Sequence, residues 1–252
     1  MRFYLGVHEP AWLTRVTVPL CVSRRRLARR KRLPRAHGEW GLDSGAFSEL
    51  SLHHEWRTRP AIYASEVRSY HSEIGGMSWA AIQDWMCEPE ILRFTGLSVG
   101  EHQRRTVESY LELRETAPGL PWMPVLQGWV ADDYLRHWEA YERAGIRLSE
   151  LPIVGLGSVC RRQATTEIGT LLGRLQGLPL HGFGVKTSGL TAYGWALRSV
   201  DSLAWSYHAR RRPPLPGCTH ASCANCLDYA LHWRACLLDN LTRGRLPFWE
   251  VE

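Results

Sequence analysis

The feature that most constrains this chain is the alternation of short apolar, β-rich runs with amphipathic helical patterns along its 252 residues. Such alternation is typical of a parallel sheet whose strands are joined by helices. The expected strands are Phe3–Val7, Val16–Val22, Trp40–Asp43, Trp79–Asp84, Met123–Gln127, Pro152–Gly157, Leu180–Val185 and Ser199–Ala204. A closed (β/α) barrel has eight strands, and a single barrel of this kind commonly contains about 250 residues. The sequence therefore predicts the α/β class and a (β/α)8 TIM-type barrel.

Three of the connecting helices can be recognised from their apolar spacing. They are predicted at Gly100–Thr116, Asp132–Ala144 and Thr165–Gln176. The second shows the pattern most clearly, because aromatic residues recur at helical intervals and a glycine follows as a stop signal. Two connections are less regular: the segment His53–Ser72 contains a proline and is expected to begin as a loop, and the basic helix at Ser23–Arg32 is short.

Polar residues and glycines fall at matching places near the ends of the expected strands. They are Asp43 after the third strand, Asp84 after the fourth, Gln127 and Gly128 after the fifth, Gly155, Leu156 and Gly157 in the sixth, and Asp201 in the eighth. The carboxyl ends of barrel strands meet at one mouth, where active sites lie. Taken singly, an aspartate after a strand is also a common helix cap, and a glycine is a common turn residue. Their recurrence in successive βα units predicts a shared site.

Such a site suits a purine of the guanine type and a reaction at its sugar. A carboxylate accepts hydrogen bonds from N1–H and the exocyclic amine, while an amide N–H donates to O6. Phe47, Trp85 and Trp129 are candidates for stacking on a base, although core packing is the ordinary role of any single one. Asp43 and Asp201 suit substitution at an anomeric carbon, in which one carboxylate attacks and the other moves protons.

Cys218, His220, Cys223 and Cys226 lie close together and form the most specific chemical signal in the sequence. Zinc prefers four N and S ligands in a tetrahedron, and Cys-x2-Cys spacing lets one turn supply two of them. His232 on the following helix is an alternative fourth ligand. Disulfides are the competing interpretation, but the N-terminus lacks the apolar core of a signal peptide and the other cysteines are scattered singly.

The chain contains no internal repeat, no low-complexity linker and no apolar run near the roughly 20 residues that span a bilayer. We therefore expect a single barrel domain over residues 1–252, with a zinc-binding subregion at residues 213–236 after the last strand. With seven cysteines and no signal-like N-terminus, the expected location is the cytoplasm, without a membrane partner.

Arginine is concentrated in two blocks of a chain whose net charge is +6. The candidate nucleic-acid-binding residues are Arg24, Arg25 and Arg29 in the first block and Arg210, Arg211 and Arg212 in the second. A charge run is usually only a solvated face. Arginine, however, pairs bidentately with phosphate, and two separate blocks in a modestly basic chain favour a nucleic-acid partner.

Several of these runs, read in chain order, resemble the motifs of one family. Asp43-Ser44-Gly45-Ala46-Phe47 is similar to Asp-Ser-Gly-Gly-Phe, Gln83-Asp84-Trp85-Met86 to Phe-Asp-Glu-Cys, Leu126-Gln127-Gly128 to Val-Gln-Gly, and Gly155-Leu156-Gly157-Ser158-Val159 to Gly-Gly-Leu-Ser-Val. Val200-Asp201-Ser202 resembles the nucleophile's strand, and the zinc cluster follows it. From about Phe3 to His232, the chain resembles the tRNA-guanine transglycosylase superfamily, most closely its DNA-acting branch, the 7-deazapurine DNA-modification transglycosylases (DpdA).

The resemblance implies base exchange in DNA, in which guanine leaves and 7-cyano-7-deazaguanine or a relative enters without strand cleavage or ATP. It implies that Asp201 is the nucleophile at C1′ and that Asp43 is the general acid/base. The implied base-binding residues are Asp84, Gln127, Gly128, Gly155, Leu156 and Gly157. The implied zinc ion is structural. The DNA is expected to be single-stranded or locally opened, because a stacked base hides its C1′, and accessory proteins of a DNA-modification system are further expected partners.

The chain departs from the family at two places: His220 stands between the first two cysteines where the tRNA enzymes have a distant histidine, and Ala46 replaces the second glycine of Asp-Ser-Gly-Gly. Three alternatives remain at this point: the same exchange on tRNA, a non-catalytic zinc-containing nucleic-acid-binding domain, and a barrel glycoside hydrolase. Aspartates at strand ends weaken the binding of a polyanion, which disfavours the second. The chemistry of a glycoside hydrolase does not explain the zinc cluster or the arginine blocks.

Overall fold

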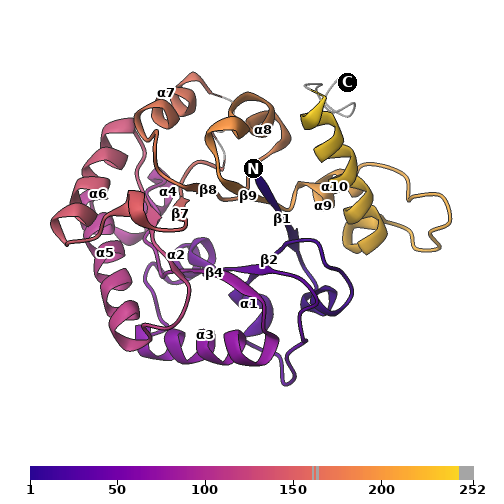
Figure 1. Cartoon of the computed structure of the whole chain (residues 1–252), viewed down its shortest axis with the longest axis horizontal. Coiled ribbons are helices and arrows are strands. Elements are labelled where there is room, and N and C mark those ends of the chain that lie inside the picture. Colours follow the sequence, from indigo (N-terminus) through magenta and orange to yellow (C-terminus); the bar gives the residue numbers. More distant parts are fainter. Residues whose placement is uncertain (161, 163–164, 244–252) are drawn as a thin grey trace.

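The strands form one parallel sheet that curves into a nearly closed barrel in the computed structural model, which describes residues 1–160, 162 and 165–243 (Figure 1). The strands are β1 (Arg2–Val7), β2 (Leu20–Ser23), β3 (Trp40–Asp43), β4 (Met77–Ala81), β5 (Trp122–Met123), β6 (Val125–Leu126), β7 (Val154–Leu156), β8 (Leu180–Gly182) and β9 (Ser199–Ser202). Their order is β5-β4-β3-β2-β1-β9-β8-β7-β6. The pairing of β1 with β9 brings the first and last strands together.

The predicted fifth strand is divided into β5 and β6, with only Pro124 between them. β5 pairs with β4, whereas β6 pairs with β7. Proline lacks the N–H that a strand ladder uses, but its carbonyl still accepts a hydrogen bond from the Gly155 N–H at 2.8 Å. The two short segments therefore share one strand position, and the covalent chain closes the ring. Eight strand positions remain, which confirms the predicted (β/α)8 barrel.

Most helices surround the barrel on its outside (Figure 1). The helices are α1 (Arg24–Leu27), α2 (Ala46–His53), α3 (Pro60–Ile74), α4 (Pro89–Thr95), α5 (Val99–Thr116), α6 (Ala131–Arg143), α7 (Thr166–Arg174), α8 (Thr187–Tyr193), α9 (Ala204–Ala209) and α10 (Leu227–Thr242). Among them, α2 is seen within the ring of strands and packs against α4 (Figure 1). The three helices predicted from apolar spacing are α5, α6 and α7. The basic helix is shorter than expected and is reduced to α1. Pro60 begins α3 after a loop, in the first turn, where its missing N–H is not needed.

The segment after β9 forms α9, a cysteine-bearing loop and α10, which lie together at one side of the barrel (Figure 1). This arrangement matches the predicted appendage after the last strand. Within the described part of the chain, no helix combines the length and the apolar character that crossing a bilayer requires.

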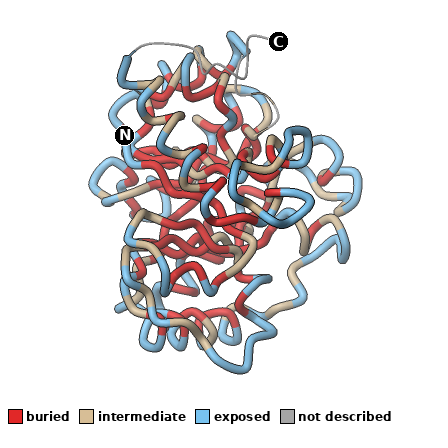
Figure 2. Tube along the Cα trace, turned by 90° about the vertical axis from the view of Figure 1, so that its right-hand side faces the viewer, coloured by how far each residue is buried: buried red, intermediate tan, exposed pale blue. Residues whose placement is uncertain are grey.

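Buried residues fill both the barrel interior and the layer between strands and helices (Figure 2). Inside the barrel, the rings of Tyr4 and Trp79 meet edge to face with centroids 5.4 Å apart. The Trp79 ring also lies 4.6 Å from that of His181. A Cβ on Gly41 would overlap the Trp79 indole, so the close packing of this interior requires glycine at that position.

We expect the substitution Gly41→Ala to lower the free energy of unfolding by about 1–3 kcal/mol, because the added methyl group displaces Trp79 from a filled interior. Gly173→Ala is the matched control, since Gly173 lies in α7 with nothing within 4 Å of the position of a Cβ. There alanine is expected to stabilise the helix by about 0.5–1 kcal/mol. Urea denaturation measures both effects, and equal stability of the two variants would contradict the packing argument.

Candidate active site and metal centre

The carboxyl ends of the strands surround a cavity of about 270 Å³. Its lining includes Asp43 at the end of β3, Asp84 beyond β4, Gln127 beyond β6 and Asp201 in β9. These residues lie far apart in the sequence, and the common direction of the strands brings them to the same mouth. The convergence expected from the sequence is present, while the chemical role of each residue stays a prediction.

Asp84 is buried and held by two side-chain donors. Ser44 Oγ donates to Asp84 Oδ1 at 3.1 Å, and Gln127 Nε2 donates to Oδ2. Burial raises the pKa of Asp84 to about 7, because the loss of water disfavours the carboxylate more than the Gln127 hydrogen bond stabilises it. The carboxyl group is therefore poised between its charged and neutral forms near neutral pH.

Gln127 is fully buried, and its side chain and backbone are both fixed. Its Oε1 lies 2.6 Å from Ser158 Oγ, and its backbone N–H donates to His137 Nδ1 at 2.8 Å. Burial lowers the pKa of His137 to about 3, so this imidazole stays neutral and able to accept. The side-chain amide of Gln103 donates to the backbone carbonyl of Gln127 at 2.8 Å. These contacts fix the direction in which the Gln127 amide points.

Gly157 and Ser158 shape the wall of the cavity beside this amide. A Cβ on Gly157 would overlap the Gln127 side chain, so the close approach requires glycine. Ser158 has a φ of 56°, a region that residues other than glycine rarely adopt, and its hydroxyl accepts a hydrogen bond from the Cys87 N–H at 2.9 Å. Strained backbone of this kind clusters at functional sites. Ser158 was absent from the predicted site set, although the Gly-Leu-Gly-Ser run was the signal for it.

Asp43 ends β3 beside Ser23, its register partner on β2. Burial raises the pKa of Asp43, the hydrogen bond from Ser23 opposes that rise, and the nearby charge of Asp201 adds to it. The chain then turns through Gly45, whose φ of 82° suits glycine, into α2. Ala46 is the first residue of α2 and does not have a positive φ. The alanine therefore leaves the conformation of this turn intact.

Asp201 lines the cavity with 13% of its side chain exposed. The Gly184 N–H donates to Asp201 Oδ1 at 3.0 Å, and His181 Nε2 lies 3.4 Å from the same oxygen. His181 belongs to β8 and is fully buried, with its Nδ1 at 2.8 Å from Ser199 Oγ. Sequence reasoning missed His181, because a single histidine within an apolar strand belongs to no chemical pattern.

Three of the predicted base-binding residues, Gly128, Gly155 and Leu156, lie outside the lining of this cavity. A Cβ on Gly128 would overlap side chains of α6, so this glycine permits helix packing. Gly155 leaves room for the Phe183 ring, which a Cβ would meet at 2.7 Å. Leu156 is buried and lines a separate small cavity among apolar residues of α7 and α8. Of the predicted Gly155–Gly157 segment, Gly157 is the residue that lines the active cavity.

The aromatic residues expected near the base differ in their placement. Phe47 lines the cavity and is 47% exposed. Trp85 is buried away from the cavity lining, and Trp129 lies under the Arg162 guanidinium at 4.2 Å from the ring centroid. Phe183 contributes a second ring to the lining. Phe47 and Phe183 are thus the aromatic rings available to a flat ligand.

The four predicted metal ligands lie together in the loop between α9 and α10. Their ligand atoms are all within 4.8 Å of one another. Cys218 Sγ is 4.0 Å from Cys226 Sγ, and His220 Nε2 is 3.1 Å from Cys223 Sγ. Bonds of about 2.0–2.3 Å to a tetrahedral zinc ion place ligand atoms roughly 3.3–3.8 Å apart. The spacing therefore fits a single ion, and it is too long for a disulfide, whose sulfur atoms are about 2.05 Å apart.

The chemistry of these donors also fits zinc. Thiolate and imidazole together select soft or borderline metals over Mg²⁺ or Ca²⁺. The Leu215 N–H points at Cys223 Sγ from 3.4 Å, as expected for a donor that supports a bound thiolate. His232, the alternative ligand, lies outside the group and has its Nε2 3.6 Å from Cys236 Sγ. The described residues therefore favour His220 as the fourth ligand.

The two arginine blocks meet at one side of the cavity mouth. β1 lies between β2 and β9 in the sheet. The segments that follow β2 and β9 therefore lie on either side of the segment that follows β1. His8 joins them, with its Nδ1 3.3 Å from Arg26 Nη2 and its Nε2 3.1 Å from Ser206 Oγ on α9. The predicted arginines that are exposed here are Arg25, Arg29, Arg210, Arg211 and Arg212.

Arg24, which was predicted with the nucleic-acid-binding arginines, does not belong to this exposed group. It is 7% exposed, and its guanidinium donates to both carboxylate oxygens of Glu66 and to Thr58 Oγ1. Glu49 lies 3.5 Å from the same guanidinium. A buried charge with its own carboxylate partners is not available to a phosphate group. Arg24 instead ties α1 to α3.

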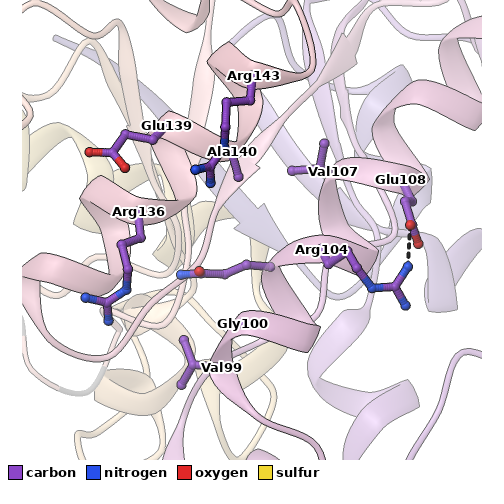
Figure 3. A pocket seen from close by; sticks show the side chains of 10 residues that line it. Val99, Gly100, Arg104, Val107, Glu108, Arg136, Glu139, Ala140 and Arg143 are labelled. Atoms are coloured by element: carbon purple, nitrogen blue, oxygen red, sulfur yellow. Dashed lines mark hydrogen bonds and ion pairs between the residues drawn. The ribbon is translucent and has the colours of Figure 1, made fainter.

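A second hollow of about 550 Å³ lies between α5 and α6 (Figure 3). Its lining contains none of the predicted catalytic residues and several charged side chains, among them Arg104 and Glu108, which form an ion pair. Gln103 also lines it and reaches the active cavity through its hydrogen bond to the Gln127 carbonyl. Gln103 therefore connects the lining of this hollow to Gln127 at the cavity.

Residues 1–247, nearly the whole chain, match the family model described as DpdA: DeoxyPurine in DNA protein A. No match to a curated protein was found. The family match spans the cavity residues and the cysteine cluster alike.

Purified protein is expected to contain one zinc ion per chain, measurable by inductively coupled plasma mass spectrometry. Cys223→Ser and His220→Ala remove ligands, so we expect both to lower the zinc content and the melting temperature. Cys236→Ser and His232→Ala are matched controls outside the ligand group and are expected to keep the metal. Loss of zinc from His232→Ala with retention in His220→Ala would show that the ligand set is wrong.

Proposed function

The chain belongs to the DpdA family, and from this premise we propose that it is a transglycosylase that exchanges guanine in DNA for a 7-deazaguanine base. The incoming base is 7-cyano-7-deazaguanine or a close relative, and the exchange proceeds through a covalent aspartyl-nucleoside intermediate. The observation that carries the proposal is the meeting of Asp43, Asp84, Gln127 and Asp201 around one cavity of about 270 Å³.

In the first half of the proposed reaction, guanine is released. A carboxylate oxygen of Asp201 forms a bond to C1′ of the target deoxyguanosine while the C1′–N9 bond breaks. The electron pair of that bond goes to the leaving base, and Asp43 donates a proton to the base. Burial raises the pKa of Asp43, which keeps this carboxyl group protonated at higher pH than an exposed one and suits it to the role of acid.

In the second half, the new base is attached. The carboxylate left on Asp43 accepts the N9 proton of the incoming 7-deazaguanine, and N9 attacks C1′. The ester bond from C1′ to Asp201 breaks, and its electron pair returns to the carboxylate. Both residues are restored, one glycosidic bond replaces another, and neither ATP nor strand cleavage is required.

The base is recognised by its Watson–Crick edge. Asp84 as a carboxylate accepts from N1–H and from the exocyclic amine. Gln127 Nε2 carries two N–H groups, and one of them is already bonded to Asp84. The other donates to O6. Phe47 and Phe183 stack on the faces of the ring.

The DNA backbone binds beside the cavity mouth, along the five exposed arginines of the two blocks. Guanidinium groups pair with phosphates and hold the strand, while the target nucleotide turns out of the stack to reach Asp201. The zinc ion supplies structural order: its four ligands fix the loop between α9 and α10, and the second arginine block begins that loop directly after α9.

We expect Asp201→Asn to abolish covalent capture of DNA and to lower base exchange by on the order of 10³-fold or more, while DNA binding persists. Exchange is measured with labelled guanine, followed by nucleoside analysis of the DNA. Asp132→Asn is the matched control, because Asp132 is exposed on α6 and paired with Arg174. Parallel reactions with tRNA decide between nucleic acids. A non-catalytic binder would show no exchange with the wild-type protein and no loss of DNA affinity in Asp201→Asn.

The pKa of Asp84 near 7 predicts how base capture depends on pH. Because this pKa is raised, the neutral form accumulates as the pH falls below about 7, and a neutral carboxyl group accepts fewer hydrogen bonds from the base. The value of kcat/KM for the incoming base is therefore expected to fall about tenfold per pH unit below 7 and to level off above it. Asp84→Asn is expected to raise KM and to remove this acid limb. An unchanged acid limb in that variant would assign the titration to another group.

A further inference from the structure

His181 is a buried imidazole that lies directly beneath the proposed nucleophile. It belongs to β8 and is fully buried among the rings of the barrel interior, with the Trp79 centroid at 4.6 Å and the Phe183 centroid at 5.0 Å. Its Nδ1 lies 2.8 Å from Ser199 Oγ, and its Nε2 lies 3.4 Å from Asp201 Oδ1.

The two nitrogens of His181 have different partners, and this difference selects one tautomer. If Nδ1 carried the proton and donated to Ser199, the lone pair of Nε2 would face the negative oxygen of Asp201. If Ser199 donates to Nδ1, the proton lies on Nε2 and points at Asp201 Oδ1. The second arrangement is attractive at both ends, so the charge of Asp201 selects the tautomer with the proton on Nε2, and the Ser199 hydroxyl supplies the matching donor to Nδ1.

Among the described residues, His181 Nε2 has no hydrogen-bond partner of ordinary length. Its distance to Asp201 Oδ1, 3.4 Å, is longer than the roughly 2.7–3.2 Å of a standard N–H···O bond. Buried nitrogens of this kind normally have a partner, and hydrogen bonds in empty active sites often shorten once substrate is bound. Asp201 is the acceptor in place to complete this one.

We propose that His181 is a positioning residue that holds one oxygen of Asp201, so that the other oxygen attacks C1′; this rests on the proposed function. Oδ1 accepts from the Gly184 N–H at 3.0 Å and from His181, whereas Oδ2 is left for the substrate. No proton moves to or from His181. In the covalent intermediate, Oδ2 is bonded to C1′ and Oδ1 is the ester carbonyl oxygen, which keeps the same two donors.

This arrangement determines which of the two carboxylate oxygens attacks. The two oxygens of a free carboxylate are equivalent, and rotation about its Cβ–Cγ bond exchanges them. Two donors on Oδ1 stop that rotation and keep the attacking oxygen aligned with C1′. Ser199 and Asp201 are two residues apart on β9, so the same strand supplies the group that fixes the imidazole and the group that the imidazole holds.

The experiment compares His181→Leu with His181→Gln. Leucine fills similar space without a donor, whereas glutamine places an amide N–H near the position of Nε2. We expect His181→Leu to slow covalent capture of DNA and kcat by about 10- to 100-fold with little change in KM for the base. We expect His181→Gln to recover most of that loss. Equal, large losses in both variants would overturn the proposal, because the ring would then matter only for its shape.

Ser199→Ala provides a second and milder measurement if His181→Leu does not fold. Without the hydroxyl, Nδ1 of His181 loses the donor that supports this tautomer, and kcat is expected to fall about three- to tenfold at a temperature where the variant is fully folded. Ser109→Ala is the matched control, since Ser109 is buried on α5 with no hydrogen-bond partner for its hydroxyl among the described residues. Wild-type rates in Ser199→Ala would overturn the proposal and leave the transglycosylase function standing. Absence of exchange by the wild-type protein would instead refute that function.

Discussion

Three carboxylates meet at one cavity, where Asp84 is buried and Asp43 and Asp201 are half-buried, and their removal from water is unfavourable. A carboxylate removed from water is destabilised by several kcal/mol unless hydrogen bonds replace its hydration. The replacing donors are Ser23 for Asp43, Gln127 for Asp84 and Gly184 for Asp201. In each pair the donor comes from the end of the strand position next to that of the acceptor. The pairing of neighbouring strands therefore supplies each carboxylate with its donor.

The barrel and the meeting of the site residues could be predicted from the sequence, because both follow from the pattern of the strands. Alternating strand and helix patterns can be recognised in a single sequence, because each element must bury one face. Parallel barrel strands then place their carboxyl ends at a common mouth. A residue such as Asp43 or Asp201 is therefore located by the strand that precedes it, without any knowledge of the loops. The division of the fifth strand at Pro124 did not disturb the prediction, since both halves keep the position of one strand.

What the sequence did not reveal depends on the direction of individual side chains. Leu156 and Gly157 are adjacent, yet they line different cavities. The Leu156 side chain faces the helix layer, whereas Gly157, directly after β7, lies at the cavity, as the alternation of a strand leads one to expect. Arg24 looks like its neighbours in a basic block, but the acids that bury it come from helices later in the chain. His181 carries no motif at all. Its place beside Asp201 follows only from the pairing of β8 with β9.

The order of the proposed reaction follows from the recognition of both bases by the same residues. If Asp84 and Gln127 recognise guanine and the incoming 7-deazaguanine alike, as proposed, the two bases compete for one position in the cavity. Guanine then leaves before the 7-deazaguanine enters, and the proposed covalent bond to Asp201 keeps the DNA attached during that interval. A direct displacement would instead need both bases at that position at once.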